Sequence, residues 1–381
     1  MKRVASLDII KMIAIFLVLV IHTIVIMPYF PRTWWSNLFT LFTVTCVPLF
    51  MMVNGALLLN KPFDRSKWAK RTIRLILLTI LWKFLLVLFC CFFWSAGETL
   101  FTARTILEYL LGGSTIYGQL GYTWFLDMYI GLQLLFPVWK HLYDHEGGRY
   151  ARLLIGVISI TLMGGETLSM LLQPVATLTG RDALPLVFSH LGSFAPFTSY
   201  AVYLVYFFIG AFLYRAVSQP AENSSDAPVT RLSQNSRALY LAGLLSYAVL
   251  YAINRYQVHY QGVSFDVIQK YTNLFTVILT SALFVFFITR TYPAWLERLG
   301  TFVGRRTFGI YIIQAAPIRV LDVLVGAFGS LTGTILPNGE GMPSPVAMIW
   351  LLFLIAVTLL YSSAIVAGCE RIPGLRRLLL R

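Results

Sequence analysis

Long apolar segments dominate the pattern of hydrophobic and polar residues along this chain. Each is about 17 to 21 residues long, and a helix of that length is about as long as the hydrocarbon core of a bilayer is thick. Polar stretches, many of them containing proline or glycine, separate the segments. The pattern predicts about ten membrane-spanning helices, roughly at 9–27, 38–58, 75–94, 122–140, 153–173, 200–217, 238–254, 272–290, 307–325 and 347–367.

The composition is typical of an all-α integral membrane protein. Hydrophobic residues make up 58% of the chain and charged residues only 12%, whereas soluble domains carry about 25% charged residues. The formal net charge of +14 would suit a nucleic-acid partner, but no soluble basic domain is present to hold one. We therefore expect a lipid bilayer, and not a nucleic acid, to be the large partner of this chain.

The distribution of basic residues predicts the orientation. Of the 30 lysines and arginines, 22 fall in alternate loops and at the two ends, six lie on the opposite side, and two lie within spans. Because basic residues concentrate on the cytoplasmic side, both termini are expected to be cytoplasmic, in the plasma membrane. The whole chain, 1–381, is expected to form one transmembrane domain, in which residues 218–237 are a flexible linker between helices.

The first span carries two ionisable side chains, Lys11 and His22. Eleven residues separate them, about three helical turns plus 20°, so both lie on one face, roughly 16 Å apart along the axis. Asp8 precedes Lys11 by three residues and is within reach of its ammonium group. A lysine near a span end can simply extend to the headgroups. His22 lies too deep for that, and an ionisable residue inside a membrane is a candidate for function.

Six basic residues precede the third span, and two of them, Arg71 and Arg74, are spaced to share one helical face. The planar guanidinium group suits bidentate binding of phosphate. The same residues would also be explained by anchoring to anionic lipid, so the pair has two interpretations at this stage.

Further ionisable residues inside predicted spans include Lys83, Asp127 and Glu166. At helical rise, Asp127 and Glu166 are expected at about the depth of His22. A carboxylate beside a histidine raises its basicity and fixes its tautomer, so either residue is a candidate partner for a histidine base. A buried lysine needs a carboxylate partner, which is the expectation for Lys83.

Two local features of the spans have structural interpretations. Asn54 and Gly55 interrupt the second span and indicate either a kink or a close contact between helices, of which close packing is the favoured reading. The four cysteines show no metal-ligand spacing and are expected to be packing residues, so no metal site is predicted: Cys46, Cys90, Cys91 and Cys369.

Several of these segments together resemble one family. The Lys11-to-His22 spacing within LDIIKMIAIFLVLVIH and the R-x-x-R motif of Arg71 and Arg74 resemble the acyltransferase 3 family, multispanning membrane enzymes that O-acetylate surface glycans. VPLF (47–50), WFL (124–126), FPV (136–138), a Y-x-x-Y-F-x-x-G pattern (203–210) and FGIYII (308–313) also match. The chain departs from the family at Thr123 and Gln314, where many members have histidine.

The resemblance implies a function and a set of roles. The donor would be a cytoplasmic acyl-CoA, most often acetyl-CoA, and the acceptor a hydroxyl group of a cell-surface carbohydrate, with no permanently bound cofactor. Arg71 and Arg74 would bind donor phosphates, and Lys11 would bind phosphate or line the donor's passage. His22 would act as general base or as nucleophile. Asp127 and Glu166 are the candidate carboxylate partners of His22.

Two other classes of protein suit the same composition. A transporter or flippase of a glycan or lipid-linked intermediate also has many helices and buried charges, but the chain shows no internal repeat of the kind common in transporters. A structural component of a polysaccharide-synthesis complex is the third possibility. Acetyl-CoA turnover by the purified protein separates the acyltransferase from both.

Overall fold

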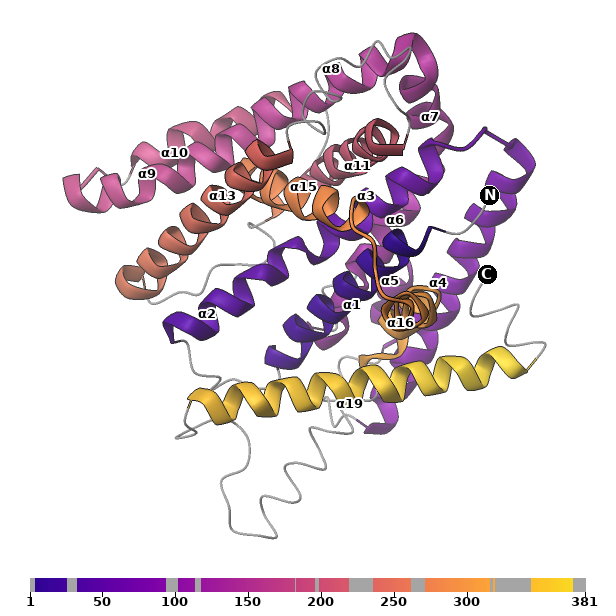
Figure 1. Cartoon of the computed structure of the whole chain (residues 1–381). Helices are drawn as coiled ribbons and strands as arrows, with labels where there is room; N and C mark the ends of the chain where they lie inside the picture. Colours follow the sequence, from indigo (N-terminus) through magenta and orange to yellow (C-terminus); the bar gives the residue numbers. More distant parts are fainter. Residues whose placement is uncertain are drawn as a thin grey trace, which may run out of the picture. The chain divides into compact units, whose positions relative to one another are not determined.

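The computed structural model describes residues 4–25, 33–93, 102–113, 118–181, 183–195, 199–218, 236–261, 271–315, 318 and 344–372. Within these ranges the chain forms helices and turns and no strand, as expected for an all-α protein (Figure 1). The chain divides into two compact units, each assembled from separate segments of sequence. The predicted linker 218–237 lies, apart from its ends, outside the described residues.

The first unit comprises the described residues of Met1–Lys61, His141–Thr307 and Pro337–Ile355. Its α-helices include, besides the first part of α19 (Ser344–Arg371), α1 (Ala5–Val25), α2 (Trp34–Leu41), α3 (Cys46–Leu59), α8 (Arg149–Ile158), α9 (Gly165–Thr179), α10 (Ala183–Ser189), α11 (Val202–Ser218), α13 (Ser236–Tyr256), α15 (Leu274–Ile288) and α16 (Ala294–Gly304). Short 3-10 and π-helical turns join several of them: η1 (Phe42–Thr45), η4 (His145–Gly148), η5 (Ser159–Gly164), η6 (His190–Phe194), η7 (Ser199–Ala201) and η8 (Gln257–Gln261).

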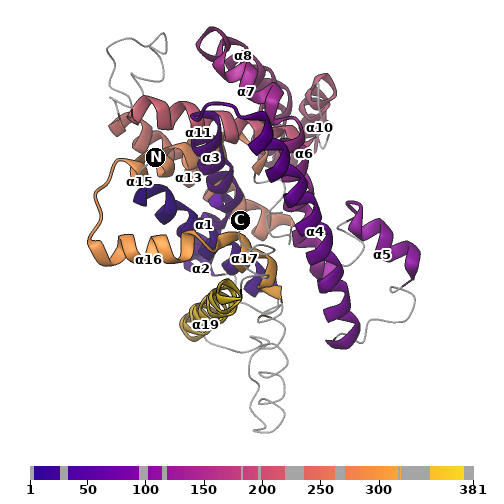
Figure 2. The same cartoon turned by 90° about the vertical axis from the view of Figure 1, so that its right-hand side faces the viewer.

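The second unit comprises the described residues of Pro62–Lys140, Phe308–Leu336 and Ala356–Arg381. The long helix α4 packs against α5 and α6, as Figure 2 shows. The helical elements of this unit, besides the end of α19, are α4 (Arg65–Phe93), α5 (Ala103–Leu110), η3 (Gly118–Thr123), α6 (Trp124–Leu134), most of α7 (Phe136–Asp144) and most of α17 (Thr307–Ile313).

Six helical segments among the described residues are long and apolar enough to cross a membrane. They are Ala5–Ile24, Trp34–Leu59, Arg65–Phe89, Phe136–Thr179, Ser236–Tyr260 and Pro345–Arg371. Two shorter apolar helices, Val202–Ser218 and Leu274–Ile288, coincide with the spans predicted at 200–217 and 272–290. The span predicted at 307–325 is described only at 307–315 and 318. A total of ten spans and the cytoplasmic side of both termini stay predictions.

The prediction of one continuous helix at 122–140 is wrong. The chain forms two helices here, α6 and α7, which meet at Leu135, whose ψ of 6° departs from helical values. The cause lies in Pro137, which has no N–H to donate to the carbonyl of Gln133 and whose ring crowds that carbonyl. Apolarity predicted membrane insertion here, but the proline decides where the helix is interrupted.

Helices of the first unit approach one another closely where glycine removes the side chain. A Cβ atom on Gly55 of α3 would lie 1.7 Å from the carbonyl oxygen of Phe207 in α11, and one on Gly210 of α11 would lie 2.3 Å from Met52 of α3. The two backbones therefore touch, and the favoured interpretation of Asn54 and Gly55 as a close contact is confirmed. Asn54 donates its amide hydrogen to Phe50 O of its own helix (2.9 Å).

Replacing Gly55 with alanine is expected to separate α3 from α11 and to lower the thermal unfolding temperature of the purified protein. Overpacking costs about 1–3 kcal/mol, which exceeds the roughly 1 kcal/mol that Gly→Ala gains in a helix. Gly156→Ala in α8 is the matched control, because a Cβ atom there meets nothing within 4 Å. Equal melting temperatures for the two variants would contradict the close contact.

Candidate active site

Helix α1 carries both ionisable residues of the predicted motif. Lys11 and His22 lie on this one continuous helix, and both side chains are half-buried. The helical geometry therefore places them on one face, about 16 Å apart along the axis. The Lys11 ammonium lies 3.9 Å from the Asp8 carboxylate, which confirms the expected contact one turn earlier.

Two glycines hold the start of α1 in place. A Cβ atom on Gly300 of α16 would lie 2.6 Å from Ile9, and one on Gly304 would lie 2.7 Å from Asp8 O, so α16 and α1 pack backbone to backbone (Figure 1). Asp8 is almost completely buried at this contact and still reaches Lys11. The G-x-x-x-G spacing of Gly300 and Gly304 is a sequence signal for close helix packing. This contact was not predicted from the sequence.

An aspartate caps the helix that carries the R-x-x-R motif. Asp64 precedes α4, and its carboxylate accepts a hydrogen bond from Lys67 N (3.0 Å). This bond, with the nearby Lys67 ammonium at 3.0 Å, holds the pKa of the Asp64 carboxyl below its ordinary value. A carboxylate at a helix N-terminus satisfies free N–H groups and fixes where the helix begins, and with it the direction of Arg71.

The interruption between α6 and α7 provides acceptors for α4. The backbone carbonyl of Gln133 receives no hydrogen bond from Pro137, which has no N–H. It accepts one from the Trp68 indole N–H instead (2.7 Å). The side-chain oxygen of the same Gln133 accepts from Arg71 Nη2 (3.0 Å). Trp68 and Arg71 are three residues apart on α4 and so reach one residue of α6 together.

The two arginines of the motif have different surroundings. Arg71 is exposed, and its guanidinium carbon lies 5.5 Å from the centre of the Phe136 ring, within the range of a cation–π contact. Arg74 is half-buried, and within the described structure its Nη2 is a buried donor with no hydrogen-bond partner. A buried donor of this kind is costly unless a ligand or water satisfies it.

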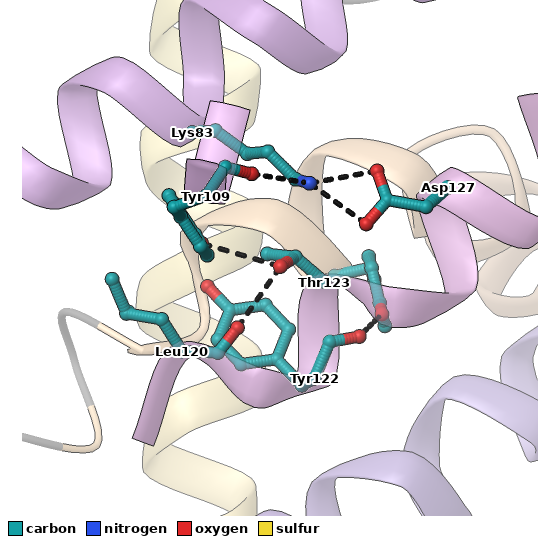
Figure 3. A network of polar contacts seen from close by, with 7 residues as sticks. Lys83, Tyr109, Leu120, Tyr122, Thr123 and Asp127 are labelled. Carbon is teal, nitrogen blue, oxygen red and sulfur yellow. Dashed lines mark hydrogen bonds and ion pairs between the residues drawn. The ribbon is translucent and has the colours of Figure 1, made fainter. Parts of the chain in front are cut away.

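A buried ion pair joins α4 to α5 and α6 (Figure 3). The Lys83 ammonium is fully buried and lies 2.7 Å from both carboxylate oxygens of Asp127. It also donates to Tyr109 O, at the last turn of α5 (3.0 Å). The predicted carboxylate partner of Lys83 is therefore confirmed, and that partner is Asp127.

The residues below this pair continue the network. Thr123 Oγ1 donates to Tyr109 Oη (3.2 Å) and to Leu120 O (3.0 Å) (Figure 3). Tyr122 donates to Ile312 O of α17 (3.1 Å). These contacts connect α5, η3 and α17 to the ion pair. Thr123, one of the departures noted above, therefore holds the network together through its hydroxyl group.

Comparison with known proteins agrees with the motifs on these helices. A family model described as an acyltransferase domain matches residues 4–367, nearly the whole chain. The chain belongs to the acyltransferase 3 family. Comparison with curated proteins gives no match, and comparison with solved structures gives none either. Together with the apolar helices, membership shows that the protein is a membrane acyltransferase.

The two predicted carboxylate partners of His22 lie on different helices of this acyltransferase. Glu166 is exposed on α9, which packs mainly on α10, whereas α1 packs mainly on α3 and α16 (Figure 1). Asp127 is held by Lys83 in the second unit, while His22 belongs to the first. A role for either carboxylate beside His22 stays a prediction.

Two residues of the contact between α4 and α6 were not expected from the sequence. Gln133 and Trp68 have no charge and no motif of their own, and only the proline four residues after Gln133 indicates a carbonyl in need of a donor. Gln314, the second departure from the family, is fully buried, and its amide makes no hydrogen bond within the described structure.

Breaking the ion pair from one side is expected to destabilise the acyltransferase strongly. Asp127→Asn leaves the buried Lys83 ammonium without its counter-charge, at a cost of about 3 kcal/mol, the lower end for buried pairs because Asp127 is a quarter exposed. The double variant Lys83→Met, Asp127→Leu should regain most of that loss. Thermal unfolding in detergent measures both. If the loss of stability in the double variant equals the sum of the losses in Lys83→Met and Asp127→Leu measured singly, the two residues are not coupled.

Proposed function

We propose that this membrane acyltransferase transfers an acetyl or another short acyl group from cytoplasmic acyl-CoA to a hydroxyl group of an extracytoplasmic cell-surface glycan or glycolipid. The observation that carries the proposal is the stripe of Lys11 and His22 on one face of α1, in a chain that belongs to an acyltransferase family. The excess of basic residues in alternate loops supports a cytoplasmic donor and the plasma membrane as the location.

In the proposed reaction His22 acts as the general base for the acceptor hydroxyl group. Its imidazole takes the proton of the acceptor hydroxyl as the oxygen attacks the thioester carbon. The carbon–sulfur bond then breaks, the acyl group stays on the acceptor oxygen, and the coenzyme A thiolate leaves and takes the proton back. If His22 acts as nucleophile instead, its imidazole nitrogen attacks the thioester carbon, the carbon–sulfur bond breaks and coenzyme A leaves as the thiol with the imidazole proton. The acceptor hydroxyl then attacks the acyl-imidazole, the carbon–nitrogen bond breaks and the imidazole takes the hydroxyl proton.

We assign the binding of the donor's phosphates to Arg71 and Arg74. Arg71 is exposed and is held by the uncharged amide of Gln133. The buried Nη2 group of Arg74 has no hydrogen-bond partner within the described structure. Both features suit binding of an oxyanion. Lys11 is assigned a secondary role toward the donor, either binding phosphate or lining its passage.

Replacing His22 with alanine is expected to abolish acyl transfer, because a positioned base contributes about 10²–10⁴-fold to the rate. Release of free coenzyme A from acetyl-CoA, measured with purified protein in lipid nanodiscs and a carbohydrate acceptor, tests this. His190→Ala is the matched control, since His190 is an exposed histidine in η6. Normal turnover in a folded His22→Ala protein would exclude the catalytic role, and absence of turnover in the wild type with every acceptor tried would favour the transporter.

Replacing Arg71 or Arg74 with alanine is expected to weaken acetyl-CoA binding by about 1.5–3 kcal/mol, the range for charge-assisted hydrogen bonds. Arg→Lys should restore little, because an ammonium group lacks the planar fork. Isothermal titration measures the affinity. Lys70→Ala, which removes an exposed charge from the same helix, is the control and should leave it unchanged. Unchanged affinity in the double alanine variant would show that the pair only anchors the helix to lipid.

A further inference from the structure

Gln133 is a buried polar residue to which neither the motifs nor the family comparison gives a role. Only 1% of it is exposed, although it lies in an apolar helix. Its backbone carbonyl is bound by Trp68 and its side-chain carbonyl by Arg71, at 2.7 and 3.0 Å. One residue of α6 is therefore fixed twice by α4.

The two bonds have different chemical consequences. The bond from Trp68 satisfies a backbone carbonyl that Pro137 leaves without a donor, so it is explained by the interruption of the helix alone. The bond to Arg71 satisfies the buried side-chain oxygen of Gln133, so it also stabilises the contact of α6 with α4. The exposed guanidinium itself does not require this bond, since solvent could satisfy it. Its effect is to hold one edge of the guanidinium against α6, with Phe136 on its face.

The acceptor is an amide and not a carboxylate, and that difference matters for an anionic ligand. A carboxylate at this place would form an ion pair with Arg71 and cancel most of its charge. An amide oxygen accepts the same hydrogen bond and leaves the full positive charge on the guanidinium. An arginine intended for a phosphate is best oriented by a neutral acceptor, since a carboxylate would repel the phosphate.

We propose that Gln133 is the positioning residue of the donor site, which orients Arg71 toward a phosphate of the acyl-CoA without neutralising it. This inference rests on the proposed role of Arg71 in donor binding. It assigns to α6 and to the interruption at Leu135 a part in donor recognition. A purely structural Gln133 would hold α6 on α4 and have no effect that depends on phosphate.

Gln133→Glu separates these two roles. The carboxylate keeps an acceptor within reach of Arg71, so a structural role predicts a folded protein that is as active as the wild type with either donor. Positioning without neutralisation predicts a fold that is preserved and a kcat/KM for acetyl-CoA at least tenfold lower, mainly through KM. With S-acetyl-pantetheine, a donor without phosphates, the variant and the wild type should have equal kcat/KM.

Companion variants keep the outcomes distinct. Gln133→Leu removes the acceptor and should also lower kcat/KM selectively for acetyl-CoA, which provides a second test if the glutamate variant does not fold. Trp68→Phe removes only the bond to the backbone carbonyl, so it should lower stability without changing the ratio between the two donors. Arg71→Ala establishes whether Arg71 contributes to phosphate recognition at all.

Each result has one meaning. If Arg71→Ala lowers kcat/KM equally for both donors, or for neither, the proposed donor role of Arg71 fails. If Arg71→Ala affects acetyl-CoA selectively while Gln133→Glu and Gln133→Leu match the wild type, Gln133 has no positioning role. Equal losses of the Gln133 variants on both donors would also overturn the inference, because they would reflect a structural role.

Discussion

Two polar groups in the apolar surroundings of the second unit need partners, and this need shapes how α4 contacts its neighbours. A backbone carbonyl without a donor, or an ammonium group without a counter-charge, costs several kcal/mol in hydrocarbon. Pro137 creates one such carbonyl, and Trp68 satisfies it. Lys83 is another such group, which Asp127 and the carbonyl of Tyr109 satisfy together. The bond from Trp68 to α6 and the contacts of Lys83 with α5 and α6 follow from these two requirements.

In the first unit, glycines allow the helices to pack closely. Without a hydrophobic driving force between helices in lipid, close backbone contact supplies the attraction, and small residues permit it. Gly55 and Gly210 bring α3 against α11, while Gly300 and Gly304 bring α16 against the start of α1. The helix that carries Lys11 and His22 is thus held at its first turns by backbone contact with α16.

Features that depend on local periodicity could be predicted from the sequence. The first helix, the face shared by Lys11 and His22, and the contact of Asp8 with Lys11 all follow from helical geometry within one segment. The family followed from motifs along most of the chain. The carboxylate requirement of Lys83 followed from the cost of burying a charge, although the sequence did not say which carboxylate would meet it.

Features that depend on contacts between segments could not be predicted from the sequence. Apolarity alone gave one helix at 122–140, because it does not weigh the missing N–H of Pro137 against the apolar run. Depth along a helix placed Glu166 level with His22, but depth says nothing about which helices are neighbours, and α9 packs mainly on α10. Gln133 was missed because it is uncharged, and only the folded structure shows that its side chain accepts a hydrogen bond from Arg71.

The central claim is that the acyl group passes from a donor on one side of the membrane to an acceptor on the other. Vesicles that contain the purified protein in one defined orientation, with radiolabelled acetyl-CoA supplied to the cytoplasmic face and a membrane-impermeant carbohydrate acceptor to the opposite face, measure this directly. The account predicts labelled acceptor only in this arrangement, and none with the His22→Ala protein. Labelled acceptor formed only when both substrates share the cytoplasmic face would contradict it.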